Sequence, residues 1–459
     1  MARTLSTTCH GAKMASQAAR PGTTPDPSID PRARRRAIVS SVIGNGLEWF
    51  DFGIYSSFSI IISRLMFPPQ SGTAMMLVAF ASFGLAFIVR PVGGVLLGIC
   101  ADRAGRKAAL SAIIMMMSVG TLLIGITPSF ASIGIAASVI IVGARMLQGF
   151  SAGGEFASAT AMLLEYAPRG HRNLIGSFQA CSQALSFALG GAAAYLLLHN
   201  LTPAALDSWG WRLPFLFGAL IGPIGYYIRS RVDESPEFAA LIEQRRHVRA
   251  ERLSLLQIVQ RFPRELLGTL GIVAVCTTSS YVGLIYIPLF AGSQLGLDPS
   301  AGQLGMLAGA LVLLVMCPIT GLLADRYGRR RVMVPAMLAY GVLAWPLLSS
   351  LVNAPSTMNL IRFELVSAML MAFFWGPSAA ALAEAFPVQI RSTGMAIVYN
   401  VGAMCFGGLA PLINAWLTRM TGDRLAPAWY IAASVLLGTL GVLAMTQRRA
   451  ELHEAQQHA

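Results

Sequence analysis

Five ionisable side chains in the first half of the chain lie inside long apolar stretches, where a charge is costly. They are the acids Glu48, Asp51 and Glu155 and the cations Arg90 and Arg145. A charged side chain at the centre of a membrane helix costs about 2.5–3.5 kcal/mol on insertion scales, so each needs a partner or a function. An arginine holds a nearby carboxylate ionised, and protonation of that carboxylate frees the arginine. These residue types together predict proton coupling.

The spacing of the acids makes them candidates for carrying the proton. Glu48 and Asp51 are three residues apart, so their side chains share one face of a helix. All six histidines fall in tails, loops or the ends of apolar stretches, which leaves a carboxylate as the proton carrier. We therefore expect Glu48, Asp51 and Glu155 to take part in proton coupling. The alternative is a structural network of ion pairs that locks the helices together.

Arginines, amides and aromatic residues in the apolar stretches are candidates for solute contacts. The arginines could bind a carboxylate, and Gln179 and Gln183 are four residues apart on one helix face. For the tyrosine and tryptophan residues, packing is an alternative explanation. The predicted substrate-binding residues are Arg90, Arg145, Asn45, Tyr55, Gln179, Gln183, Tyr281, Trp375 and Asn400.

The composition indicates that lipid surrounds much of the chain. Of the 459 residues, 55% are hydrophobic and only 12% are charged, against about 25% charged in a soluble domain. A helix of ~20 apolar residues crosses a bilayer. Twelve stretches are long enough, and we predict an all-α membrane protein with twelve transmembrane helices at 38–64, 73–98, 108–128, 132–162, 174–198, 212–230, 265–292, 302–324, 332–351, 358–384, 394–418 and 427–446.

The basic residues set the orientation of these spans. The net charge is +13 and the pI about 10, which alone would suggest a nucleic-acid partner. However, the connections 65–72, 129–131, 199–211, 293–301 and 352–357 contain no lysine or arginine, whereas those on the other side are basic. This alternation follows the positive-inside rule. It predicts a multi-pass protein of a bacterial inner membrane with both termini in the cytoplasm, and it explains the pI without nucleic acid.

Two pairs of segments repeat about half a chain length apart. Residues 98–107 and 321–330 share the pattern Gly-x-x-x-Asp-Arg-x-Gly-Arg, and a glutamate and an arginine at 165 and 172 recur at 384 and 391. The aspartates can meet a helix N-terminus or an arginine across the seam between two halves, in one state of the protein and not in the other. The alternative is a basic hairpin that only sets topology. The predicted gating residues are Gly98, Asp102, Arg103, Gly105, Arg106, Gly321, Asp325, Arg326, Gly328, Arg329, Glu165, Arg172, Glu384 and Arg391.

The duplication predicts two pseudo-symmetric six-helix bundles and thereby divides the chain. Ser235 and Pro236 can begin a surface helix in the connection between the halves, and a solvated linker is the alternative. The predicted parts are a disordered cytoplasmic tail at 1–36, an N-terminal bundle at 37–230, a cytoplasmic linker at 231–264, a C-terminal bundle at 265–446 and a cytoplasmic tail at 447–459.

The repeated loops resemble the signature of the major facilitator superfamily. Residues 44–55, with the sequence GNGLEWFDFGIY, look like the first span of its metabolite:proton symporter branch, as do the segments 90–94, 145–149 and 209–215. The resemblance covers about residues 37 to 446. It implies uptake coupled to protons. Members of this branch carry citrate, α-ketoglutarate, other dicarboxylates, shikimate, or zwitterions such as proline and betaine.

The sequence favours a secondary active transporter over an enzyme. It has no zinc-protease or ATP-loop motif, and its six cysteines are scattered, so we expect no cofactor and no metal. We predict a monomer that imports a di- or tricarboxylate such as citrate or α-ketoglutarate by proton symport with alternating access. Its partners would be the solute, protons and the lipid bilayer. The alternatives are a carrier of proline, betaine or a shikimate-like acid, an exporter, or a membrane sensor that does not transport.

Overall fold

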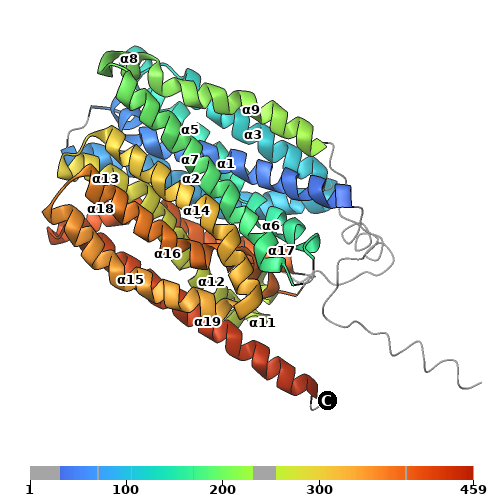
Figure 1. Cartoon of the computed structure of the whole chain (residues 1–459). Coiled ribbons are helices and arrows are strands. Elements are labelled where there is room, and N and C mark those ends of the chain that lie inside the picture. Colours follow the sequence, from blue (N-terminus) through green and yellow to red (C-terminus); the bar gives the residue numbers. More distant parts are fainter. Residues whose placement is uncertain are drawn as a thin grey trace, which may run out of the picture.

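A computed structural model describes residues 31–69, 72–104, 106–168, 170–230, 255–387 and 390–457, and within these ranges the regular structure is entirely helical. The helices of the first half gather on one side of the molecule and those of the second half on the other (Figure 1). This arrangement is the twelve-helix fold in two six-helix bundles that the sequence predicts.

Each predicted span of the first half corresponds to one helix or one interrupted helix. The fourth span is interrupted at Gly153 and Gly154, between α5 and α6. The elements are α1 (Pro31–Met66), α2 (Gly72–Ala104), α3 (Arg106–Ile126), α4 (Phe130–Ile133), α5 (Ile135–Ala152), α6 (Glu155–Glu165), α7 (Arg172–Asn200), α8 (Pro203–Ser208), the short 3₁₀ turn η2 (Gly210–Arg212) and α9 (Leu213–Ser230).

Two spans of the second half contain a π-helical turn, where the helix is wound more widely. The first of these turns is η3 (Ser279–Tyr286), between α12 (Pro263–Thr278) and α13 (Ile287–Leu295), and the second is η4 (Ala403–Gly408), between α17 (Arg391–Gly402) and α18 (Ala410–Thr421). Such turns are rare and are frequent at functional sites. The other elements are α11 (Leu255–Arg261), α14 (Pro299–Tyr327), α15 (Arg329–Asn353), α16 (Thr357–Glu384) and α19 (Ala426–Gln457).

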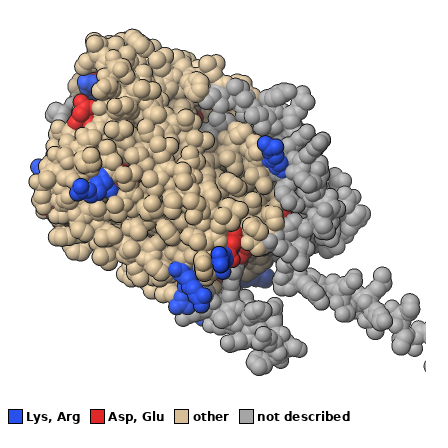
Figure 2. All heavy atoms as spheres, viewed as in Figure 1, with Lys and Arg blue, Asp and Glu red and all other residues tan. Residues whose placement is uncertain are grey.

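The outer surface of the helices is apolar. In the described part of the chain, nine helical segments are long and apolar enough to cross a membrane, and Ser111–Ile126 is a shorter apolar helix. Large apolar side chains such as Leu220 and Val342 are 71% exposed. The face seen in Figure 2 carries few charged side chains. A surface of this kind fits the lipid-facing side of a membrane bundle.

The structure corrects the predicted boundary of the N-terminal tail. Residues 31–36, expected in a disordered tail, form the first turns of α1. Residues 447–457, predicted only as a cytoplasmic tail, continue α19 as helix. The linker ends in the short helix α11, while the predicted surface helix from Ser235 lies outside the described residues, as do residues 1–30. The start of the first helix was misjudged because a polar sequence at the end of an apolar helix can continue that helix into water.

The two halves pack closely against each other. α7 of the first half lies along α14 of the second, and α2 lies along η4 and α18. The rings of Phe156 and Tyr399 stack across this seam with their centroids 3.5 Å apart. Phe87 of α2 fits against Gly408, where a Cβ atom would lie 2.1 Å from its ring. Small residues thus let the helices of the two halves approach within van der Waals contact.

The contact between α2 and α5 gives a prediction about packing. A Cβ atom on Gly149 of α5 would lie 1.9 Å from the carbonyl oxygen of Ala86, whereas one on Gly143 of the same helix would meet nothing within 4 Å. We expect Gly149→Ala to lower the melting temperature in detergent, because overpacking costs about 1–3 kcal/mol. The matched variant Gly143→Ala should leave it unchanged or raise it slightly, since alanine favours helix. Equal melting temperatures for the two variants would contradict this account.

Candidate functional site

A buried ion pair joins the first two helices. The Arg90 Nη2 group on α2 lies 2.5 Å from Oε1 of Glu48 on α1, and both side chains are withdrawn from solvent. The same nitrogen also donates to the carbonyl oxygen of Ala152, 3.3 Å away at the end of α5. A buried pair of this kind depends on its partner, because removal of one member leaves the other charge uncompensated.

The Arg90 guanidinium also lies at the seam between the halves. Its carbon is 5.4 to 5.7 Å from the ring centroids of Phe52, Phe87 and Tyr399, and the last of these belongs to the second half. Within the described structure its Nε and Nη1 atoms have no hydrogen-bond partner. Buried donors without acceptors are rare, so these two N–H groups are available to bind an acceptor.

Asp51 and Arg145 are connected through two neutral side chains. The Thr121 hydroxyl of α3 donates to the Asp51 carboxylate, and Gln148 Nε2 of α5 donates to that hydroxyl over 3.0 Å. Arg145 Nη1 donates to Gln148 Oε1 over 2.8 Å. All four side chains are buried. A change in the charge of Asp51 can therefore reach Arg145 by rearranging hydrogen bonds.

Arg145 is further held by aromatic residues and a backbone group. Its guanidinium carbon is 4.1 Å from the ring centroid of Tyr55, and its Nη2 donates to the carbonyl oxygen of Phe83 over 3.1 Å. The Tyr55 hydroxyl donates to Ser82 over 2.9 Å. In this conformation Tyr55 therefore positions Arg145, and neither side chain lines the central cavity described below.

The predicted acids are brought into the same bundle, but they do not form one cluster. Glu48 and Asp51 are three residues apart on α1, but their carboxylates have partners on different helices. Glu48 pairs with Arg90 of α2, and Asp51 accepts from Thr121 of α3. Glu155 is buried in the first turn of α6, directly after the interruption of the fourth span, and it lies within electrostatic range of Arg90. The first half therefore holds two separate polar sets, one around Arg90 and one around Arg145.

A small cavity of about 40 Å³ lies between the halves. Predicted contacts Gln179, Gln183 and Trp375 line it, together with residues that the prediction omitted, including Trp49, Phe156 and Thr277. Trp49 could have been found, because it stands between the two acids of α1 in sequence. A single water needs roughly 10–15 Å³ of such a cavity volume. The cavity therefore has room for a few waters and is too small for a metabolite.

The remaining predicted contacts support the cavity without lining it. Gln179 Nε2 donates to the side-chain Oδ1 of Asn45 over 2.9 Å, which orients the glutamine. Asn400 donates to the carbonyl oxygen of Gly153 over 2.7 Å and so connects the two halves. Tyr281 packs its ring against aromatic rings of the first half, among them Trp49. In this conformation these side chains hold the cavity-lining residues and the two halves in place, and they do not face the cavity themselves.

The second copy of the repeated loop closes one end of the seam. The Asp325 carboxylate of α14 accepts hydrogen bonds from the backbone nitrogens of Asn173 and Leu174, each over 3.0 Å, and from Asn173 Nδ2 over 2.8 Å. These groups form the N-terminus of α7, where the helix dipole favours an anion. The aspartate of one half therefore caps a helix of the other, which is the geometry expected from the sequence.

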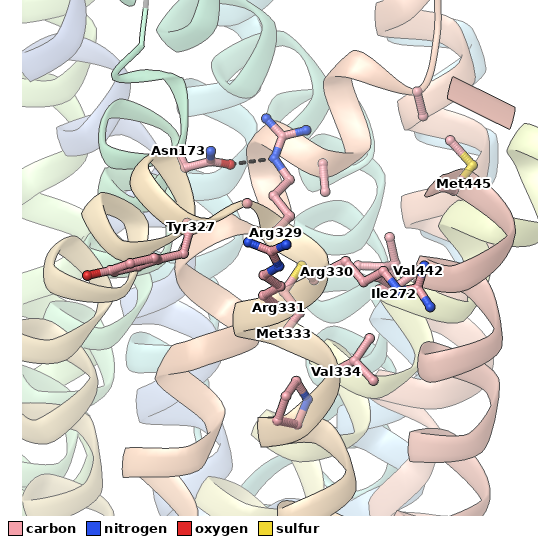
Figure 3. A pocket seen from close by; sticks show the side chains of 15 residues that line it. Asn173, Ile272, Tyr327, Arg329, Arg330, Arg331, Met333, Val334, Val442 and Met445 are labelled. Carbon is pink, nitrogen blue, oxygen red and sulfur yellow. Dashed lines mark hydrogen bonds between the residues drawn. The ribbon is translucent and has the colours of Figure 1, made fainter. Parts of the chain in front are cut away.

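Neighbouring charges extend this contact. Arg329 Nε donates to Asn173 Oδ1 over 2.5 Å (Figure 3). Its Nη1 lies 3.0 Å from Oε2 of Glu384. Arg172 of the first half lies 3.4 Å from the same glutamate. A pocket of about 740 Å³ opens beside the contact. In the first copy, the side chains of the predicted gating residues at positions 98–106 lie outside the described part of the structure.

The opposite end of the seam is closed as well. Ser293 of α13 donates to the Met76 sulfur of α2 over 3.2 Å, and the rings of Phe80 and Tyr286 pack with centroids 5.7 Å apart. Because contacts between described residues join the halves at both ends of the seam around a cavity of this size, we call this conformation occluded. Access to the cavity from either side requires the two halves to separate at one end.

Comparison with known proteins places this geometry in a family. Residues 37–447 match the family model described as "Sugar (and other) transporter". The citrate-proton symporter of Klebsiella pneumoniae is 34% identical over 418 residues, which cover 91% of this chain and 93% of that protein. The proline/betaine transporter of Escherichia coli K12 is 31% identical over 425 residues, covering 91% and 85%.

Solved structures agree on the fold. The proton:xylose symporter XylE bound to 6-bromo-6-deoxy-D-glucose has a TM-score of 0.73 at 17% identity, covering 89% of this chain and 95% of that one. A crystal structure of a D-xylose-proton symporter has a TM-score of 0.68 at 18% identity, covering 88% and 96%.

The Asp325 contact gives a prediction about closure. Asp325→Asn should weaken the capped end of the seam, because a hydrogen bond to a charged group contributes about 1.5–3 kcal/mol. In the Ala380→Cys background, whose reporter thiol would lie at the buried contact with Gly176, we expect maleimide labelling in detergent to accelerate about tenfold or more.

The control for this experiment is Asp298→Asn at the other end of α14. That carboxylate accepts from the backbone nitrogen of Ser300 over 2.8 Å, within its own helix. Its substitution should leave the labelling rate unchanged. Equal labelling rates in the two variants would show that Asp325 does not hold the seam closed.

Proposed function

The chain belongs to the sugar (and other) transporter family of the major facilitator superfamily, and we propose that it imports a small organic acid together with protons by alternating access. The proposed solute is a di- or tricarboxylate such as citrate or α-ketoglutarate. The proposed setting is a bacterial inner membrane, with both termini and the Asp325 end of the seam in the cytoplasm. The segments 37–230 and 265–446 would move relative to each other as two bodies of one monomer.

The observation that carries the proposal is the pairing of Arg90 with Glu48. In the occluded structure Glu48 Oε1 accepts from Arg90 Nη2, while two other N–H groups of the arginine have no partner in the described structure. Protonation of Glu48 would remove its charge and free the arginine for a solute carboxylate. Proton and anion would then bind together, because either one alone leaves a buried charge uncompensated.

The position of Arg90 supports a role in solute binding. Tyr399 lines the cavity and places its ring on the Arg90 guanidinium. Movement of this ring as the halves separate would bring the guanidinium to the cavity wall. The chain from Asp51 to Arg145 would provide a further response to protonation in the same bundle. Glu155 is proposed to join the set around Arg90.

A zwitterion with a quaternary ammonium group is the second candidate solute. The cavity wall includes four aromatic side chains, Trp49, Phe156, Trp375 and Tyr399, and none of its lining residues is charged. Aromatic faces attract quaternary ammonium groups such as that of betaine. The carboxylate of such a zwitterion could bind Arg90 as well, so both candidates use the same arginine.

Uptake by proteoliposomes tests the solute. We expect labelled citrate or α-ketoglutarate to accumulate inside when the outside is acidic, and a protonophore to abolish this accumulation. Accumulation of betaine or proline without either acid would favour the second candidate. Accumulation driven outward under physiological gradients would indicate an exporter. Absence of both uptake and counterflow across the panel would contradict transport and favour a sensor.

Substitution of the acids tests the coupling. Glu48→Gln and Asp51→Asn should each lower the accumulation ratio, by about tenfold per pH unit of gradient for each coupled proton lost, while solute counterflow persists, because the neutral side chains cannot carry a proton. Asp207→Asn is the control, since Asp207 forms a partly exposed pair with Arg64 and such pairs contribute at most about 1 kcal/mol. If both acid variants concentrate the solute normally, the assignment of proton coupling is wrong.

A further inference from the structure

Glu364 of α16 carries a buried carboxyl group that the proposed coupling does not use. Its exposed fraction is 0%, and within the described structure neither carboxyl oxygen has a hydrogen-bond donor or a basic side chain within ion-pair distance. An ionised carboxylate without a partner in an apolar interior costs far more than a protonated one. The neutral acid is therefore the form that this environment accepts.

The neighbouring helix is shaped to receive this side chain. Gly305 and Gly309 lie one turn apart on α14, and both face Glu364. A Cβ atom on Gly309 would lie 3.1 Å from Glu364 Oε2, and one on Gly305 would lie 3.3 Å from its Cγ. The two glycines thus form a niche that holds the carboxyl group by its shape and offers no charge to it.

Among the described residues, no cation faces the niche from the elements packed around it. α15 contributes Tyr340, whose buried hydroxyl has no partner in the described structure and which lies within electrostatic range of Glu364. α14 presents the two glycines. The charged or titratable groups of the other elements point elsewhere. Arg362 of α16 and His199 of α7 are exposed, and Tyr195 of α7 stacks on His199. The η3 residues Tyr281 and Tyr286 pack on Phe87 and Phe80 of α2, respectively.

The π-helical turn η3 lies between this niche and the central cavity. Leu284 of η3 contacts the Gly309 position on the niche side, while Ser280 lines the cavity. The Tyr340 hydroxyl lies 3.8 Å from the position of a Cβ atom on Gly283, also in η3. A widely wound turn is a place where a helix can change its winding, and such a change would expose the niche to cavity water.

We propose that Glu364 is a second proton-binding site, which holds its proton in the occluded state and exchanges it with cavity water once per transport cycle when η3 moves. The O–H bond of the carboxyl group breaks, the proton passes to water, and the anion exists only while water reaches it. The claim that Glu364 binds a proton is argued from the geometry alone. The claim that this proton is transported with the solute also depends on the proposed function.

Infrared spectroscopy tests the bound proton without any solute. The difference spectrum between the reconstituted wild type and Glu364→Gln at neutral pH should contain the C=O stretch of a protonated carboxylic acid. Glu384→Gln is the matched control and should remove only carboxylate bands, because Glu384 is paired with Arg329. A difference spectrum for Glu364→Gln that contains only carboxylate bands would overturn the proposal.

A second variant keeps this test decisive if Glu364→Gln fails to fold. Tyr340→Phe retains the packed ring and removes a buried hydroxyl within electrostatic range of the carboxyl group. It should shift the frequency of the protonated C=O band, since the polar surroundings of the acid change. A spectrum identical to that of the wild type in this region would then count against a protonated Glu364.

The accumulation ratio tests whether this proton is transported. With the membrane potential clamped at zero, each coupled proton multiplies the equilibrium ratio roughly tenfold per pH unit. With citrate as solute, or betaine if the panel identifies betaine, Glu364→Gln should lower the ratio about tenfold at a gradient of about one unit and retain counterflow. An unchanged ratio would overturn the coupled role, and no uptake by the wild type would instead overturn the proposed function.

Discussion

The structure depends on the cost of placing charge in an apolar interior. Arg90 and Arg145 are both inaccessible to solvent. The packing of the first bundle places groups around them that compensate their positive charges. Arg90 takes a carboxylate directly, whereas Arg145 reaches one only through Gln148 and Thr121. Aromatic faces surround both guanidinium groups and exclude water from them. Any change in one acid must therefore be answered by movement of a cation or by arrival of another anion.

The two bundles answer this constraint differently. In the first bundle the acids are matched with arginines, so the charge state and the helix positions are linked. In the second bundle the buried polar groups near the cavity are neutral hydroxyls, an indole and an amide, and Glu364 stands apart from any cation among the described residues. The halves share a fold and a repeated loop but divide the chemistry unequally between them.

Much of this arrangement could be predicted from the sequence, because its causes are local or repeated. Apolar length predicted the spans, and the repeat of Asp325 predicted a contact across the seam. The partner of each acid could not be predicted, since spacing on α1 does not say which helix packs beside which turn. The π-helical turns were missed for a similar reason. A proline follows each turn, Pro288 and Pro411, and lacks the N–H that would bond the carbonyl oxygen four residues earlier. A proline by itself does not say whether the helix kinks, ends or widens.

The cap on α7 has a consequence for the evolution of this chain. Two of the three hydrogen bonds that Asp325 accepts come from peptide nitrogens of Asn173 and Leu174, which every residue type except proline supplies. Substitutions in the first turn of α7 therefore leave most of the hydrogen bonds to Asp325 intact, whereas substitution of the aspartate removes all of them. Selection at this junction should therefore act on Asp325, and homologous chains should tolerate different residues at the positions of Asn173 and Leu174.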